Sequence, residues 1–373
     1  MTPHYPGVYI EEIANPVRSI SGSPTGIGAF IGAATRGPSR QPRRVRSFAE
    51  FEQVFGALVA DLELGYAVQQ FFLNGGTDAW VVRVNRGLTK ASVFAGLAAL
   101  ADVELFNLLA IPGCTNAEVL AAAIEPCRKR HAFLIIDAPK NASPEEMQQA
   151  LQSGAIPRSP DAAVYYPWIQ LADALRAGQQ RLSPPSGSVA GVIARNDKAR
   201  GVWKAAAGLE AVVHGALGLE RALTDDENGL LNPLGVNCLR IMRGSITVWG
   251  SRTLTGNDAA ASEWKYIPVR RMALFLSNSI ERGLQWTVFE PNDEPLWARI
   301  RLNVGAFMNE LFRAGAFQGR TPRDAYFVKC DRETMTQDDL EAGRVVVLIG
   351  FAPVKPAEFV ILKIRIKAAT APD

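Results

Sequence analysis

Three glycines at positions 26, 28 and 32 have a spacing that could support cofactor chemistry. Glycine-rich loops bind dinucleotide phosphates when they follow a strand and open a helix. Here the pattern is GxGxxxG, no strand precedes it, and no acidic ribose ligand follows at the required distance. We therefore expect Gly26, Gly28 and Gly32 to allow close packing of a strand, and we expect no cofactor-binding residues.

Possible metal ligands are equally dispersed along the chain. The three histidines, His4, His131 and His214, form no HxxxH or HExxH pair. The acidic run Asp225-Asp226-Glu227, followed by Asn228-Gly229, lacks the alternating ligand spacing of a calcium loop. The sequence therefore predicts a solvated turn at 225–229 and no metal site.

Asp137 is the carboxylate best placed for catalysis, because it ends a predicted strand of an α/β layer. Ala138-Pro139 follow it, and no partner base is evident. The nucleophile motif GxSxG and the phosphate-binding motif GxxxxGK[ST] are absent from the sequence. We therefore expect Asp137 to be a structural cap, and we expect no catalytic residues and no enzyme activity.

The cysteines also suggest structural roles. They are widely separated and form no CxxC pair: Cys114, Cys127, Cys238 and Cys330. In a chain that folds in the cytoplasm they are expected to be buried small hydrophobes without disulfides.

Bulk properties exclude several classes of protein. A chain of 373 residues predicts two or three packed units. The net charge of +3 is too small to indicate a nucleic-acid partner. The N-terminal residues do not resemble a secretory signal, and the most apolar window, 95–112, is interrupted by Asp102, Glu104 and Asn107. We therefore expect no membrane insertion, and we expect the chain to be made in the cytoplasm.

The densest charge run consists of Arg40, Arg43, Arg44 and Arg46, just before a predicted helix. It has no interleaved aromatic residues of the kind that stack on single-stranded nucleic acid. A solvated strand or loop is the first interpretation, and a contact between subunits is the alternative.

The elements that must position these residues alternate between strand and helix. Strands are predicted at 26–34 and 79–84, and helices at 47–56 and 61–73; Ser47 and Glu50 have capping-box spacing. Further strands are predicted at 103–111, 133–137 and 162–166, with helices near 117–130, 144–151 and 188–200 and a loop at 179–187. This alternation is typical of an α/β fold with parallel pairing.

The last third predicts a strand at 246–249, helices at 269–289 and 295–317, and strands at 326–330 and 344–349. The second helix carries an apolar stripe made of Leu296, Ile300, Val304, Phe307 and Leu311. Its polar stripe consists of Arg299, Asn303, Glu310 and Arg313.

Both ends of the chain contain segments suited to strands. Residues 1–22 are broken by prolines and predict an extended arm with apolar residues at Val8, Tyr9, Ile10 and Ile13. Near the C-terminus, Val360, Leu362, Ile364 and Ile366 alternate with other residues in a one-sided strand. In an ordinary protein such a strand is more often an edge of its own sheet than an addition to a neighbour's sheet.

Short motifs in consistent order and spacing run through nearly the whole chain. They are YPGVYIEE at 5–12, SFAEFEQVFG at 47–56, FFLNGGTDAWVVRV at 71–84, IIDAP at 135–139, NPLGVNCLR at 232–240, VWGSRTL at 248–254, YIPVRR at 266–271, FEPND at 289–293, LFRAGAFQG at 311–319 and KPAEFVILKI at 355–364. Together they resemble the contractile tail sheath family, which covers phage sheaths, R-type bacteriocins and extracellular contractile injection systems.

This resemblance implies a mixed α/β subunit with two domains and exchanged terminal strands. It implies an inner domain formed by 23–84 with 236–355, an outer α/β domain at 85–235, and arms at 1–22 and 356–373. The arms would add strands to the sheets of neighbouring subunits and form a mesh. Such heterologous contacts do not close and generate a helical tube.

The resemblance also implies partners and a mechanism. A sheath polymerises around an inner tube, with baseplate and cap proteins at its ends, and contracts to drive the tube through a target envelope. The helix that carries Arg299, Asn303, Glu310 and Arg313 would face the inner tube. The assembled product would be a phage-tail-like particle. The alternatives are a cap-like or baseplate-proximal paralogue and, more distantly, an α/β enzyme with a site in the middle region.

Overall fold

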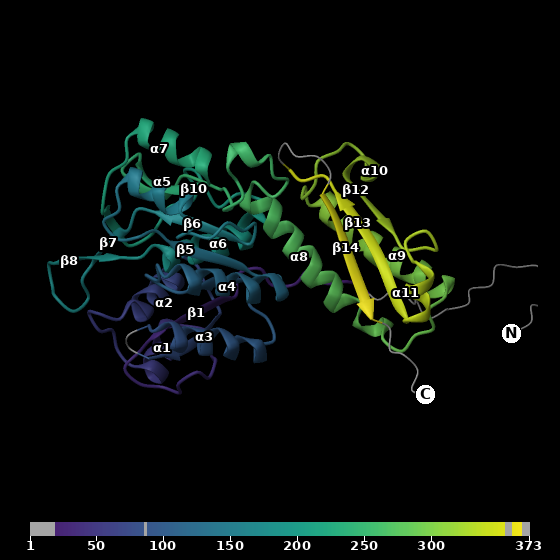
Figure 1. The fold of residues 1–373 in the computed structure, drawn as a ribbon, viewed down its shortest axis with the longest axis horizontal. Helices are drawn as coiled ribbons and strands as arrows, with labels where there is room; N and C mark the ends of the chain where they lie inside the picture. Colours follow the sequence, from purple (N-terminus) through teal and green to yellow (C-terminus); the bar gives the residue numbers. More distant parts are fainter. Residues whose placement is uncertain (1–18, 86–87, 355–359, 368–373) are drawn as a thin grey trace, which may run out of the picture. The chain divides into compact units, whose positions relative to one another are not determined.

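The computed structural model describes residues 19–85, 88–354 and 360–367, the last segment as backbone alone (Figure 1). The chain divides into two compact units. The larger unit contains residues 22–278 with 352–360, and the smaller unit contains the described parts of 1–21, 279–351 and 361–373. The unit boundaries therefore differ from the domain limits expected at residues 85 and 235, because strands from both sides of residue 85 share one sheet.

An eight-stranded sheet forms the centre of the larger unit, in the order β11-β10-β6-β5-β4-β1-β3-β2. Its strands are β1 (Gly28–Ala33), β2 (Arg43–Val45), β3 (Ala79–Val84), β4 (Leu108–Ala110), β5 (Phe133–Asp137), β6 (Ala162–Tyr166), β10 (Val236–Met242) and β11 (Ser245–Val248). The central pairs are parallel, whereas β2 pairs antiparallel with β3 and β11 pairs antiparallel with β10. The predicted α/β fold with parallel pairing is confirmed.

Helices cover both faces of this sheet. They are α1 (Phe48–Phe55), α2 (Glu63–Leu73), α3 (Lys90–Ala99), α4 (Ala117–Lys129), α5 (Pro144–Gln152), α6 (Ser186–Arg200) and α7 (Asp225–Leu231). Because side chains alternate along a strand, Ala29 and Ile31 of β1 enter the core with α3 and α4, whereas Phe30 enters the core with α1, α2 and α6.

The glycines of the GxGxxxG pattern serve close packing, as predicted. A Cβ atom at Gly28 would lie 2.7 Å from the Phe30 ring, and one at Gly32 would lie 2.8 Å from Leu64 Cβ. At Gly26 it would lie 2.9 Å from Ala194 Cβ of α6. These separations are too short for any larger residue unless the Phe30 ring, or the helices that carry Leu64 and Ala194, are displaced.

The helix starts follow the predicted capping chemistry, with one difference. Ser47 accepts a hydrogen bond from the backbone N–H of Glu50 at 3.2 Å. Glu50, however, accepts from the backbone N–H of Arg46 rather than from that of Ser47, at 2.7 Å. The reciprocal bond of the capping box is therefore displaced by one residue.

A second, three-stranded sheet in the larger unit has the order β8-β7-β9, formed by β7 (Ile169–Ala172), β8 (Gln180–Ser183) and β9 (Ala216–Leu219). The loop predicted at 179–187 is wrong, because β8 pairs with β7 and α6 begins at Ser186. Short 3₁₀ helices are η1 (Leu100–Asp102), η2 (Asn232–Leu234), η3 (Asp258–Ala260) and η4 (Gln285–Thr287).

Helix α8 (Ile267–Gly283) starts in the larger unit and ends in the smaller one. The smaller unit contains α9 (Glu294–Arg313), α10 (Pro322–Ala325), α11 (Gln337–Glu341) and a three-stranded sheet in the order β12-β13-β14. These strands are β12 (Tyr326–Lys329), β13 (Arg344–Phe351) and β14 (Val360–Lys367). The whole predicted apolar stripe of α9, from Leu296 to Leu311, is buried.

Candidate functional site

Asp137 lies at the carboxyl end of β5 and is 2% exposed. Its carboxylate accepts hydrogen bonds from the backbone N–H and the hydroxyl of Ser186, both at 2.7 Å, and from the backbone N–H of Gly113 at 2.9 Å. Burial raises the pKa of Asp137 to about 6, against the opposing effect of these three donors. Asp137 therefore caps the start of α6, and the structural interpretation is confirmed.

The residues considered as metal ligands do not come together. Within the described residues, no group of three or more His, Cys, Asp or Glu side chains could hold a metal ion. The His131 carbonyl accepts from Asn278, and the His214 N–H donates to Asn74; His4 lies outside the described residues. The turn predicted at 225–229 is wrong, because these residues form the first turns of α7.

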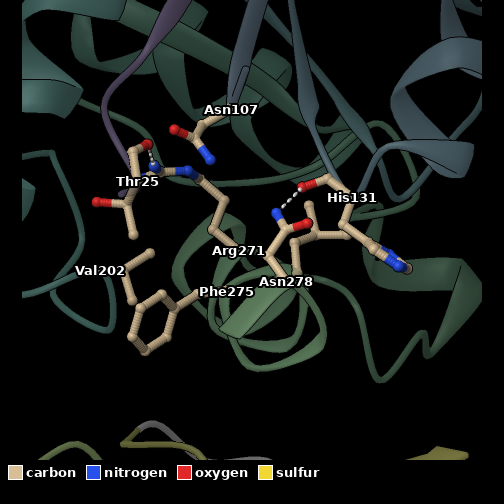
Figure 2. Close-up of a pocket in the computed structure, with 8 residues that line it drawn as sticks. Thr25, Asn107, His131, Val202, Arg271, Phe275 and Asn278 are labelled. Carbon is tan, nitrogen blue, oxygen red and sulfur yellow. Dashed lines mark hydrogen bonds between the residues drawn. The ribbon is translucent and has the colours of Figure 1, made fainter. Parts of the chain in front are cut away.

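A small hollow in the larger unit is lined by residues of several distant segments, and Figure 2 shows its lining. Arg271 reaches across it and donates to the Thr25 carbonyl at 2.9 Å, and Asn278 donates to the His131 carbonyl at 3.1 Å. Arg271 also binds the buried carboxylate of Asp197. The polar groups of this hollow are therefore engaged in holding α8 against the rest of the unit.

All four cysteines are buried and free of disulfides, as predicted. Burial raises the pKa of the Cys238 and Cys330 thiols to about 12 and raises that of Cys127 well above its ordinary value. Thiols with such pKa values are poor nucleophiles at neutral pH, because the thiolate is the reactive form.

The predicted polar stripe of α9 is only partly exposed. Glu310 and Arg313 are exposed, whereas the half-buried Arg299 binds Glu290 at 2.7 Å and lies over the Trp286 ring at 5.2 Å. Asn303 is 1% exposed, and within the described residues neither its oxygen nor its nitrogen has a hydrogen-bond partner. Asn303 is therefore a core residue, and its assignment to an exposed stripe was wrong.

The C-terminal segment forms a strand, as predicted. Residues Val360–Lys367 form β14, which lies beside β13 at one edge of the sheet of the smaller unit (Figure 1). In the single chain this strand therefore pairs with its own sheet. The apolar residues predicted for the N-terminal arm, Val8, Tyr9, Ile10 and Ile13, lie outside the described residues.

Two residues of the arginine run, Arg43 and Arg44, lie on β2, the outermost strand of the large sheet, and Arg40 and Arg46 lie on either side of it. Arg44 donates to the Asp78 carboxylate at 2.8 Å and lies over the Trp80 ring at 5.7 Å. The hydrogen bond to Asp78 raises the pKa of Arg44. Arg40, Arg43 and Arg46 are exposed to solvent.

Two features were not predicted from the sequence. Arg270 and Arg271, the last residues of the motif YIPVRR, bind the buried carboxylates of Asp161 and Asp197, both at 2.6 Å. Phe289, the first residue of FEPND, is 84% exposed and has a positive φ of 73°. The motifs include these positions, but a local sequence pattern cannot show which residues Arg270 and Arg271 bind or that Phe289 is exposed.

Within the described residues, no helix combines the length and apolar character that a membrane span needs.

Comparisons with known proteins match nearly the whole chain. The model for the phage tail sheath protein central domain matches residues 86–254, and that for the phage tail sheath C-terminal domain matches residues 259–367. Among solved structures, the PVC sheath complex of an extracellular contractile injection system, in its contracted state, is 30% identical with a TM-score of 0.78, over 97% of each chain.

Two further relatives are also sheath proteins. The helical sheath of the anti-feeding prophage in its contracted state is 30% identical with a TM-score of 0.76, over 97% of this chain and 99% of that chain. The tail sheath protein of Burkholderia phage BcepMu is 26% identical over 288 residues. That match covers 72% of this chain, which spans 58% of the length of the phage protein.

Proposed function

This chain belongs to the phage tail sheath family, and from that membership we propose that it is a structural subunit of a contractile sheath. The subunit polymerises helically around an inner tube and contracts to drive the tube through a target envelope. The observation that carries the proposal is the likeness to the PVC sheath, which extends over 97% of both chains. A likeness of this extent includes both compact units rather than the α/β unit alone.

The chemistry of the larger unit supports a structural role over an enzymatic one. Asp137, its best placed carboxylate, uses both oxygens to hold Ser186 and Gly113. A general base must also be within reach of a substrate proton, and this carboxylate is only 2% exposed. The arginine of the hollow in Figure 2, Arg271, is likewise occupied by Asp197 and Thr25.

We propose that the two ends of the chain link neighbouring subunits. In support, β14 lies at an edge of the sheet of the smaller unit, where one strand can be replaced by an equivalent strand from another copy. The N-terminal arm, with Val8, Tyr9, Ile10 and Ile13, would add to the same kind of edge. Exchange of identical strands keeps the backbone hydrogen bonds and changes only which copy supplies them.

We propose that the exposed end of α9 faces the inner tube, through Glu310 and Arg313, with Arg299 at the border of the surface. Exposed ion pairs contribute only about 0–1 kcal/mol each. Contacts of this strength can align a tube and still break when the sheath moves. Asn303 is excluded from this surface by its burial.

The proposed partners are further copies of the chain, an inner tube protein, and baseplate and cap proteins at the two ends. The subunit would be made in the cytoplasm of the producing cell and assembled into a phage-tail-like particle.

Sedimentation of the purified chain tests the proposed function. A sheath subunit forms large polymers without any ligand and pellets in an ultracentrifuge, in amounts that rise with protein concentration. An enzyme, or a cap-like paralogue that needs partners before it assembles, would remain in the supernatant as small particles.

A further inference from the structure

The outermost strand of the large sheet and the residues on either side of it present cations that the fold itself does not use. Arg40, Arg43 and Arg46 are exposed, and the guanidinium groups of these three residues form no ion pair with any carboxylate in the described part of the chain. Arg43 donates only to the Gln41 side chain, at 3.4 Å. Neighbouring Arg44 differs, because Asp78 binds it. We name Arg40, Arg43 and Arg46 the arginine edge.

The backbone that carries these cations is held firmly. β2 pairs with β3 in a defined register, Arg43 opposite Val81 and Val45 opposite Ala79, and Val45 is fully buried. The Arg40 N–H donates to the Arg83 carbonyl at 2.8 Å, in a turn with a positive φ of 56°. The arginine edge is therefore a pre-organised surface, and little backbone entropy is lost when a partner binds it.

Carboxylates are exposed at the opposite end of the same unit. Helix α7 packs against β10, the second strand from the far edge of the sheet, and its first turn is fixed by the capping box of Thr224 and Glu227. The Asp225 side chain is 93% exposed, although Arg240 binds it, and Asp226 is exposed beside it. Figure 1 shows α7 and α1, the helix that follows β2, at opposite ends of the larger unit.

We propose that the arginine edge of one copy binds the carboxylates at the start of α7 in a second copy. This inference rests on the proposed function, in which many copies of the chain assemble. Because the two surfaces lie at opposite ends of the unit, one pair of copies cannot make this contact twice, so the contact is head-to-tail rather than symmetric. A head-to-tail contact does not close on itself and extends into an open helix.

Arginines on an edge strand have a second role, which is to prevent unwanted strand pairing. The two roles predict different results for a change of sign. Arg43→Glu keeps a charge on the edge, so protection against pairing is retained. Binding to carboxylates is lost, because like charges then face each other.

A charge-swap experiment on the purified full-length chain tests the proposal. Tube yield is measured by sedimentation and negative-stain microscopy at roughly 0.1 M salt, where surface charges still interact. Arg43→Glu and Asp226→Lys should each lower the yield about tenfold or more, the change expected for each 1.4 kcal/mol lost from a contact. The double variant Arg43→Glu/Asp226→Lys should recover to within about threefold of the wild type, because the attraction is restored with its sign reversed.

Arg128→Glu is the matched control, because Arg128 is also exposed, lies on α4 of the same unit, and binds only the neighbouring Glu125. It should leave the tube yield unchanged, and every variant should keep the melting temperature of the wild-type monomer. Normal tubes from Arg43→Glu, or no recovery in the double variant, would overturn the proposal. If the wild type itself forms no tubes, the proposed function fails and not this contact alone.

Discussion

Arg271 of α8 and Asp197 of α6 form a buried ion pair, with their side chains 6% and 3% exposed and the two guanidinium nitrogens 2.8 and 2.6 Å from the carboxylate oxygens. The pair joins the start of α8 to the helix that Asp137 caps. Since Arg271 also donates to the Thr25 carbonyl, one side chain connects three segments that are distant in the sequence.

Loss of one partner of this ion pair should destabilise the folded protein. Arg271→Met leaves the Asp197 carboxylate buried without its cation, and we expect the free energy of unfolding to fall by about 3–5 kcal/mol. Arg271→Met/Asp197→Leu should lose much less than the sum of the single variants. Urea unfolding measures each value, with the exposed Arg128→Met as the control. Additive losses in the double variant would show that the two residues do not act as a pair.

Replacement of the buried Asn303 should stabilise the protein. Its side chain has no hydrogen-bond partner among the described residues, and such a group costs about 1–3 kcal/mol. Asn303→Leu is close in shape and should raise the free energy of unfolding by about 1–2 kcal/mol. Asn309→Leu on the same helix is the control, because it includes the same gain in helix propensity at a less buried position. An equal rise in the free energy of unfolding at both positions would show that the buried Asn303 amide has no cost of its own.

Asp137 should give the folded protein a distinct pH dependence. The pKa of Asp137 is about 6 in the folded state and about 3.8 in the unfolded chain. The folded state therefore binds the proton more tightly than the unfolded state does. The stability contribution of the protonated carboxyl is therefore complete below pH 3.8, falls as the pH rises to 6, and is lost above that value.

Asp137→Asn removes this titration. The free energy of unfolding of the wild type minus that of the variant should decrease by roughly 2 kcal/mol between pH 4 and 7, at about 1.4 kcal/mol per pKa unit. Subtraction cancels the titration of groups that do not interact with Asp137. Glu63, whose charge also raises the pKa of Asp137, is coupled to it and contributes to the difference. A difference that stays constant over this range would show that Asp137 keeps its ordinary pKa.

Truncation tests the role proposed for the two arms. Ile20 is buried, and the site of a Cβ on Gly283 lies only 2.8 Å from its side chain, so removal of residues 1–18 preserves this contact whereas removal of 1–22 does not. Chains that lack 1–18, or everything after Phe359, should remain folded monomers and form no tubes. Removal of 368–373 alone retains β14 and should leave assembly intact. Tubes from both longer truncations would refute strand exchange.

Charge reversal tests the surface proposed to face the inner tube. Arg299→Glu/Arg313→Glu should reduce binding to the inner tube protein while the sheath subunits still polymerise, because α9 keeps its buried apolar stripe. Co-sedimentation of the two proteins measures this binding. Unchanged binding of the double variant would exclude α9 from the contact.

Local sequence patterns were sufficient to predict the limits of short, buried strands. β3, β5 and β6 have the limits that the sequence predicts, because each is an apolar run bounded by turn residues. β8 was missed because Gln180–Ser183 includes a single apolar residue, Leu182, and follows no clear alternation, so only pairing with β7 makes these residues a strand.

Periodicity identified the helical faces but not the environment of every residue on them. Asn303 follows the polar stripe in the sequence, yet the fold encloses it. The limits of the two compact units differ from the expected domain limits for a related reason. The pairing of β1 with both β3 and β4 joins segments on either side of residue 85, and no local pattern records such long-range contacts.

Negative-stain electron microscopy of the chain expressed alone tests the central claim most directly. A contractile sheath subunit should form long hollow tubes of uniform width, without ligand and without other proteins. Uniform small particles at every protein concentration, with no tubes, would contradict the account.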